Sequence, residues 1–120
     1  MNATNEFWTA LQSLQLASQI GTQYDYKEPS MRQICLATAE YFNVPYLDML
    51  GRKRRAELME ARHYAMYACI NLTRNGYADI GRFFDRDHTS VMYAEQKISG
   101  LSSQKQFQDY LEYISGVAKI

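Results

Sequence analysis

The sequence predicts an all-α fold, a small domain of about six helices. Apolar residues recur three and four positions apart through most of the 120-residue chain, as they do on the buried face of a helix. Residues that end helices separate these segments: Pro45, Gly51 and Gly76. Two of the segments, within residues 78–98, are short, amphipathic and joined by a turn too tight for structure of its own. That outline is a helix-turn-helix.

The first half of the chain predicts three helical segments. Residues 4–20 carry wide apolar stripes and are followed by a polar linker up to residue 27. Residues 30–42 place apolar side chains on one face, and the segment ends before Pro45 because a residue before proline is pushed out of the α region. Residues 46–50 predict one short helical turn, which Gly51 ends.

The longest predicted helix covers residues 56–75, with Gly76 as its stop. Its expected inward residues are Leu58, Ala61, Ala65, Ala68, Cys69 and Leu72. Arg62 and His63 are expected to project near its beginning. A last helix is expected after a cap at Ser102 or Ser103.

The helix-turn-helix segment divides at Asp85 and Arg86. Asp87 stands before the second helix, where a carboxylate can accept an amide hydrogen bond as N-cap. The expected buried stripe is Val91, Ala94 and Ile98, and the expected exposed stripe is Thr89, Tyr93 and Lys97. Such an exposed face can meet bases at its N-terminal end and phosphates along its length. Periodicity alone favours the alternative, an ordinary solvated face.

Charge is distributed unevenly although the net charge is zero. Residues 1–50 hold two basic and five acidic side chains, residues 51–97 hold nine and six, and residues 98–120 hold two and two. Four cations are consecutive at residues 52–55. A run of this kind is either a solvated patch or a contact for nucleic acid.

Other chemistry is not expected. Asp87, His88, Thr89 and Ser90 include the residue types of a hydrolase triad, but neighbours on a helix point about 100° apart. Neither histidine has partners at metal-ligand spacing, and no glycine-rich phosphate loop occurs. We therefore expect no enzyme, no catalytic residue, no metal and no cofactor.

The compartment is predicted from two further features. Cys35 and Cys69 lie inside apolar patterns, which predicts two buried, reduced thiols. The sequence contains neither an apolar stretch of about 20 residues nor a signal peptide. We expect a cytoplasmic, nucleoid-associated protein without a membrane partner.

The wording of the motifs resembles a known family. The run R-D-H-T-S-V at residues 86–91, with Ile80-Gly81 before it and Lys97-Ile98 after it, is similar to the signature of the C-terminal DNA-binding domain (domain IV) of the bacterial replication initiator DnaA. Residues 46–55 and 60–66 look like the basic loop and the following helix of that domain, in the right order. The resemblance covers roughly residues 30–115.

The resemblance implies a DnaA domain IV-like, Trp-repressor-like domain at residues 28–120, with residues 1–27 outside it. It implies base contacts in the major groove by Asp87, His88 and Thr89, and in the minor groove by Arg54. The implied phosphate contacts are Arg52, Lys53, Arg55, Arg62, His63, Arg86, Ser90, Tyr93 and Lys97. The implied target is double-stranded DNA with an AT-rich DnaA box of the TTATnCACA type.

We expect a stand-alone bacterial or phage factor without the family's ATPase domain, which modulates replication initiation or transcription. The alternative is an adaptor that keeps the fold and docks onto a replication protein, or onto its own copy, through residues 1–20. Some positions depart from the family pattern. Asp85 stands where the turn usually has two glycines, and Ala61, His63 and Ser90 replace proline, glutamine and threonine.

Overall fold

Six α-helices and one 3-10 turn make up residues 28–118, which are the part of the chain that the computed structural model describes. They are α2 (Met31–Phe42), α3 (Tyr46–Leu50), α4 (Ala56–Leu72), α5 (Tyr77–Phe83), α6 (His88–Ser99), α7 (Lys105–Ser115) and η1 (Gly116–Ala118). No strand occurs in this range, so the predicted all-α class is confirmed. The predicted helix at residues 4–20, its linker and its suggested partner contact lie outside the described residues.

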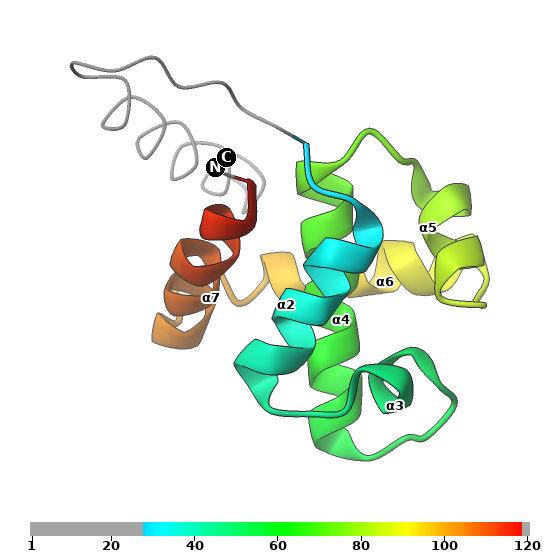
Figure 1. Cartoon of the computed structure of the whole chain (residues 1–120), viewed down its shortest axis with the longest axis horizontal. Coiled ribbons are helices and arrows are strands. Elements are labelled where there is room, and N and C mark those ends of the chain that lie inside the picture. Colours follow the sequence, from blue (N-terminus) through cyan, green and yellow to red (C-terminus); the bar gives the residue numbers. More distant parts are fainter. Residues whose placement is uncertain (1–27, 119–120) are drawn as a thin grey trace.

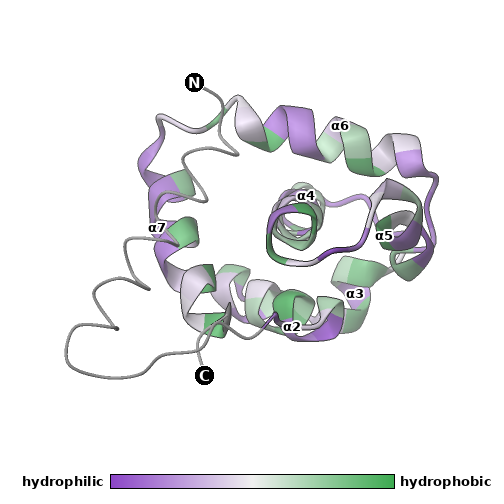
Figure 2. Cartoon of the chain, turned by 90° about the horizontal axis from the view of Figure 1, so that it is seen from above, coloured by the Kyte–Doolittle hydropathy of each residue, from purple (hydrophilic) through white to green (hydrophobic). Residues whose placement is uncertain are grey.

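Helix α4 lies at the centre of the domain. Viewed along its axis, it is surrounded by α2, α3, α5, α6 and α7 (Figure 2). Its predicted inward residues are all buried. Because neighbours cover the helix on several sides, Tyr64, Met66 and Tyr67 are buried as well. Helix α6, the second helix of the helix-turn-helix, packs along one side of this central helix.

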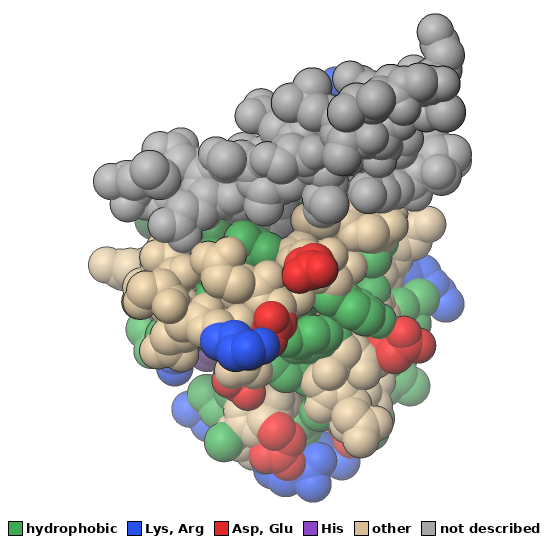
Figure 3. Space-filling model, turned by 90° about the vertical axis from the view of Figure 1, so that its left-hand side faces the viewer, with side chains coloured by type: hydrophobic (Ala, Val, Ile, Leu, Met, Phe, Trp, Pro, Cys, Tyr) green, Lys and Arg blue, Asp and Glu red, His purple; other side chains and the backbone are tan. Residues whose placement is uncertain are grey.

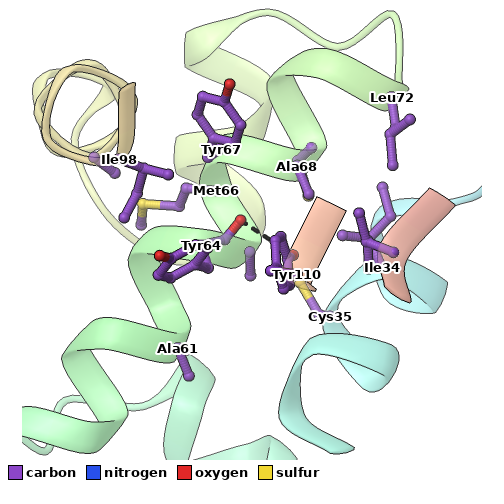
Figure 4. Packing of buried hydrophobic residues seen from close by; sticks show 14 of the residues in the cluster. Ile34, Cys35, Ala61, Tyr64, Met66, Tyr67, Ala68, Leu72, Ile98 and Tyr110 are labelled. Atoms are coloured by element: carbon purple, nitrogen blue, oxygen red, sulfur yellow. Dashed lines mark hydrogen bonds between the residues drawn. The ribbon is translucent and has the colours of Figure 1, made fainter. Parts of the chain in front are cut away.

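A polar contact inside the core joins α2, α4 and α7. The Tyr110 hydroxyl lies 2.8 Å from Thr38 Oγ1 and donates to the carbonyl oxygen of Tyr64 over 3.3 Å (Figure 4). Cys35 lies beside this contact, and both Cys35 and Cys69 are buried, as predicted, with free thiols. The face on the α7 side mixes acidic, basic and apolar side chains (Figure 3).

Two predicted helix boundaries are wrong. Helix α4 ends at Leu72 rather than Asn75, because Thr73 turns to extended backbone and its amide and hydroxyl both donate to the Cys69 carbonyl. Gly76 is therefore the N-cap of α5 and not the stop of α4. The last helix begins at Lys105 after an N-cap at Gln104, since residues 101–104 form a further turn in which the Gln104 amide bonds the Leu101 carbonyl.

Other helix ends follow local rules. Helix α2 begins with a capping box, in which Ser30 and Gln33 each accept the other's backbone amide. It ends at Asn43, which takes a left-handed conformation with φ of 55°. The segment that follows leads into α3, which packs against α4.

Candidate nucleic-acid interface

The turn between α5 and α6 is a Schellman motif. The amide of Arg86 donates to the Gly81 carbonyl (2.8 Å) and the amide of Asp85 donates to the Arg82 carbonyl (3.1 Å). Asp85 takes the left-handed conformation, with φ of 55°, that such a motif requires at this position. The glycine-free turn therefore keeps the left-handed residue and uses an aspartate for it, a residue that tolerates this region better than most.

Gly81 allows α5 and the start of α6 to touch. A Cβ on Gly81 would lie 2.7 Å from the carbonyl oxygen of Arg86 and 3.3 Å from the backbone of Asp87 and His88. Backbone cannot give way as a flexible side chain can. The angle between α5 and α6 thus depends on a glycine at position 81, because a residue with a Cβ would push the two helices apart.

Helix α6 presents the two faces that the spacing predicted. Val91, Ala94 and Ile98 are buried, whereas Thr89, Tyr93 and Lys97 are exposed. Asp87 is the N-cap by position, as predicted, but its carboxylate makes no cap hydrogen bond. Instead, it lies 2.7 Å from Nδ1 of His88.

The charge of Asp87 is favoured by its surroundings. Desolvation raises its pKa, but the nearby amide and hydroxyl of Thr89 and the His88 side chain and amide outweigh this effect, so the pKa lies below its ordinary value. The first turn of α6 therefore carries a carboxylate acceptor, an imidazole and a hydroxyl side by side. These are groups that can recognise base edges.

The basic loop, residues 52–55, is exposed, as predicted. Three of its cations have acidic partners: Arg52 with Asp85 (2.8 Å), Lys53 with Asp48 (3.3 Å) and Arg55 with Glu57 (3.2 Å). Within residues 28–118, Arg54 is the loop cation that has no hydrogen bond or ion pair. Its side chain is available for a ligand.

An open cleft of about 420 Å³ lies between the basic loop, the first turns of α4 and the first turns of α6. Its lining residues are Arg52, Arg54, Met59, Arg62, His63, Met66, Arg86, Thr89, Ser90 and Tyr93. None of these described lining residues is acidic, and four are arginines. The cleft thus brings together most of the side chains that the sequence assigned to DNA contacts.

The cations in the cleft repel one another. Burial, with Arg86 and Arg54 nearby, lowers the pKa of Arg62 to about 10. Burial, with Lys97, Arg62 and Arg86 nearby, lowers the pKa of His63 to about 4, so this imidazole is neutral at pH 7. An anion in the cleft would relieve this repulsion.

Arg62 lies differently from the prediction. Its side chain does not project from α4 but is buried, and the guanidinium donates to the carbonyls of Met49 (2.7 Å), Lys53 (3.1 Å) and Asp48 (3.4 Å). The reason is that α3, which packs against α4, and the connection after α3 supply these carbonyls. A signal was present in the sequence, since Arg62 stands four residues after Leu58 on the inward stripe.

Arg86 is also engaged with backbone. Its guanidinium donates to the carbonyls of Gly51 (2.6 Å), Phe84 (2.9 Å) and Leu50 (3.5 Å). Burial and the nearby Arg52 lower its pKa, against the opposing effect of Asp85. Sequence reasoning missed these contacts because two of the three partners stand 35 and 36 residues away.

An aromatic pair, His63 and Tyr93, lines the cleft, and Lys97 lies next to Tyr93 outside the lining. His63 and Tyr93 pack edge to face, with ring centroids 5.7 Å apart. Lys97 Nζ lies 5.8 Å from the centroid of the Tyr93 ring. The His63–Tyr93 contact joins the exposed stripe of α6 to α4, whereas the Lys97–Tyr93 contact lies within α6.

Two kinds of site are not found in the described part of the chain. No helix within residues 28–118 is long and apolar enough to cross a membrane. In the same range, no group of three or more His, Cys, Asp or Glu side chains is placed to hold a metal ion.

A tight helix-turn-helix whose second helix borders a cleft lined with arginine defines a DNA-binding domain of the helix-turn-helix class. The chain belongs to the bacterial DnaA helix-turn-helix family, because the model of that family matches residues 31–98, more than half of the sequence. The predicted resemblance is confirmed. The chain is also similar to the chromosomal replication initiator protein DnaA of Mycobacteroides abscessus, with 41% identity over 76 residues, or 63% of this chain. The matched region spans 16% of that relative's length.

Proposed function

We propose that this chain binds double-stranded DNA at AT-rich boxes of the DnaA type and so modulates replication initiation or transcription at the nucleoid. The observation that carries the proposal is the cleft between the basic loop and α6. It has Arg54 at one edge, Thr89 at the other, and no acidic lining residue among those described.

The two edges of the cleft would contact different grooves of the duplex. The first turn of α6 would enter the major groove, with Asp87, His88 and Thr89 at base edges. Arg54, which has no other partner in the described residues, would enter the adjacent minor groove, where AT-rich sequence concentrates negative potential. A sugar-phosphate backbone separates the two grooves, so the cationic cleft would receive it.

Phosphate contacts would come from both sides of the cleft. The exposed candidates are Arg52, Lys53, Arg55, Tyr93 and Lys97, and Ser90 is a half-buried candidate. His63, neutral at pH 7, would act as a hydrogen-bond donor rather than as a cation. Arg62 and Arg86 already bond to carbonyls, so they would contribute mainly positive potential from the floor of the cleft.

The zero net charge does not oppose this proposal, because the charge that matters is local. Counterion release depends on how many phosphates meet a cation, and the cleft and basic loop supply several at one face.

The test is a set of binding isotherms for a TTATnCACA duplex and a scrambled duplex at three salt concentrations. The proposal predicts a cognate affinity at least about 1,000-fold above the scrambled one, with a linear dependence of log K on log salt. Equal affinity for both duplexes would reduce α6 to an electrostatic surface. Absence of binding to either would favour the adaptor function, with residues 1–20 as the contact.

A further inference from the structure

Two guanidinium groups connect the basic loop to the helix-turn-helix. Arg86, at the α5–α6 turn, donates to the carbonyls of Leu50 and Gly51, which directly precede the loop, and also to the carbonyl of Phe84 in its own turn. Arg52, in the loop, donates through Nη2 to the carboxylate (2.8 Å) and the carbonyl (3.2 Å) of Asp85. The α3–α4 connection and the α5–α6 turn accordingly lie at the same side of the domain (Figure 1).

The contacts of Arg86 are better shielded than those of Arg52. The Arg86 hydrogen bonds are partly buried, whereas the Arg52 and Asp85 side chains are 74% and 86% exposed. Exposed ion pairs are weak, and hydrogen bonds removed from water are costly to leave unmade. Arg86 is therefore the main link between the two segments.

The geometry differs from that of a side chain held ready for phosphate. Arg86 Nη2 donates to the Gly51 carbonyl, and Nη1 donates to the carbonyls of Leu50 and Phe84, so the guanidinium joins two separate segments. The planar fork of an arginine can hold two acceptors at a fixed separation, which the single ammonium of a lysine cannot. Arg82, by comparison, is exposed on α5 and pairs with Asp79 in the same helix.

We propose that Arg86 is a positioning residue that fixes the loop carrying Arg54 at a set distance from the first turn of α6. This proposal rests on the proposed function, in which Arg54 and Thr89 contact different grooves of one DNA site. Because this distance is fixed, the domain binds tightly only when the AT-rich half of the box and the half that α6 contacts are separated by the correct spacing. Without the link, the loop can adapt to other spacings, but the protein binds the correct spacing less tightly. The reason is that ordering the free loop then costs free energy at the moment of binding.

The experiment compares wild-type protein, Arg86→Lys and the control Arg82→Lys. Both substitutions keep the positive charge, but only the first removes a fork that joins two segments. Each protein is titrated with three duplexes: the intact TTATnCACA box, the box with one base pair inserted at the central position, and the box with that position deleted.

We expect the insertion and the deletion to weaken wild type and Arg82→Lys by roughly 10- to 100-fold, the effect of one lost base contact. Arg86→Lys should bind the intact box about 10-fold less tightly, and the altered spacings should weaken it less than about 3-fold further. A purely structural role for Arg86 would lower stability and leave the ratio between spacings unchanged. An unchanged ratio overturns the proposal.

A second measurement needs no DNA. Amide hydrogen exchange at residues 51–55 should accelerate at least about 10-fold in Arg86→Lys and stay at the wild-type rate in Arg82→Lys. Unchanged exchange in Arg86→Lys overturns the link even if the box is not the target. A wild-type protein that ignores the box, with accelerated exchange in the variant, overturns the proposed function and the spacing role while the link stands.

If Arg86→Lys fails to fold, Arg52→Ala replaces it, because a lysine ammonium could keep the contact with Asp85 that a single Arg52 nitrogen makes. The Arg52 side chain is exposed, and its loss breaks the reciprocal contact with Asp85. The spacing ratio and the exchange rates should then shift in the same direction by a smaller factor. Wild-type values for both overturn the proposal.

Discussion

The α-carbon of Gly81 faces the backbone of Arg86 at a distance that leaves no space for a side chain. A Cβ there would lie 2.7 Å from the Arg86 carbonyl oxygen, while the Gly81 carbonyl accepts the Arg86 amide over 2.8 Å. The two residues are therefore joined twice, by the close approach of the Gly81 α-carbon to the Arg86 carbonyl and by the hydrogen bond from the Arg86 amide to the Gly81 carbonyl. This contact sets how closely the first helix of the helix-turn-helix approaches the second.

Gly81→Ala should destabilise the domain by about 2 to 3 kcal/mol, because the added methyl meets backbone and forces the helices apart. Urea unfolding measures the change. Gly116→Ala is the matched control, since a Cβ there meets nothing within 4 Å and the residue is already helical. It should be neutral or slightly stabilising. A Gly81→Ala protein as stable as the control would refute the close contact.

Asp85 holds a left-handed backbone without glycine. Asp85→Gly and Asp85→Ala both remove the carboxylate that Arg52 contacts, but only alanine keeps the steric cost of φ near 55°. Glycine should therefore give the more stable variant, by about 0.5 to 1 kcal/mol after its greater unfolded-state entropy is counted. Thermal and urea unfolding of the pair measure the difference. Equal stabilities would mean that the turn relaxes to another conformation.

Substitutions at Thr89 and Lys97 should distinguish a base contact from a phosphate contact. Thr89→Ala should cost on the order of 1 to 3 kcal/mol on the TTATnCACA duplex and much less on a scrambled duplex. Lys97→Ala should weaken both duplexes by similar factors and reduce the salt slope by about one counterion. Isotherms at several salt concentrations distinguish the two patterns. If Thr89→Ala weakens both duplexes equally, Thr89 does not read a base.

His63 makes stability depend on pH. Its pKa falls from 6.5 to about 4 in the folded domain, chiefly through burial and then through Lys97 and Arg62. Between these values the unfolded chain binds the proton first, so the stability contributed by neutral His63 is lost as the pH falls from about 6.5 toward 4.

Over that window the difference between wild type and His63→Gln should change by roughly 1 to 2 kcal/mol, a figure reduced for the partly solvated position of the ring. Urea unfolding at pH 7, 6 and 5 measures the difference. Glutamine keeps the size and a hydrogen-bonding group but does not titrate. Parallel pH profiles for the two proteins would show that His63 is protonated in the folded state as readily as in the unfolded state.

Local signals accounted for the elements and for the faces of α6. The i, i+3, i+7 spacing of Val91, Ala94 and Ile98 predicted which side is buried, because helix periodicity ties spacing directly to direction. Asp87 marked the start of the helix for a similar reason, since N-cap preferences are local, although its carboxylate makes no cap hydrogen bond. The family motif at residues 86–91 then indicated DNA binding before any tertiary contact was known.

The same signals misplaced the end of α4 and the side chain of Arg62. Thr73 ended the helix three residues early by bonding the Cys69 carbonyl, a competition that propensity does not rank. The family resemblance implied phosphate contacts for Arg62 and Arg86, yet their guanidinium groups donate to carbonyls of α3 and of the segment that follows it.

The sequence by itself thus determined the all-α class, the helix-turn-helix and the residue types of the candidate DNA surface. Each of these depends on neighbours within about two turns of a helix. Only the tertiary structure decided that Asp85 carries the left-handed turn, that Gly81 touches Arg86, and that two arginines hold the basic loop. These last contacts join residues up to 36 positions apart, and no periodic pattern predicts which distant carbonyl a partly buried guanidinium will contact.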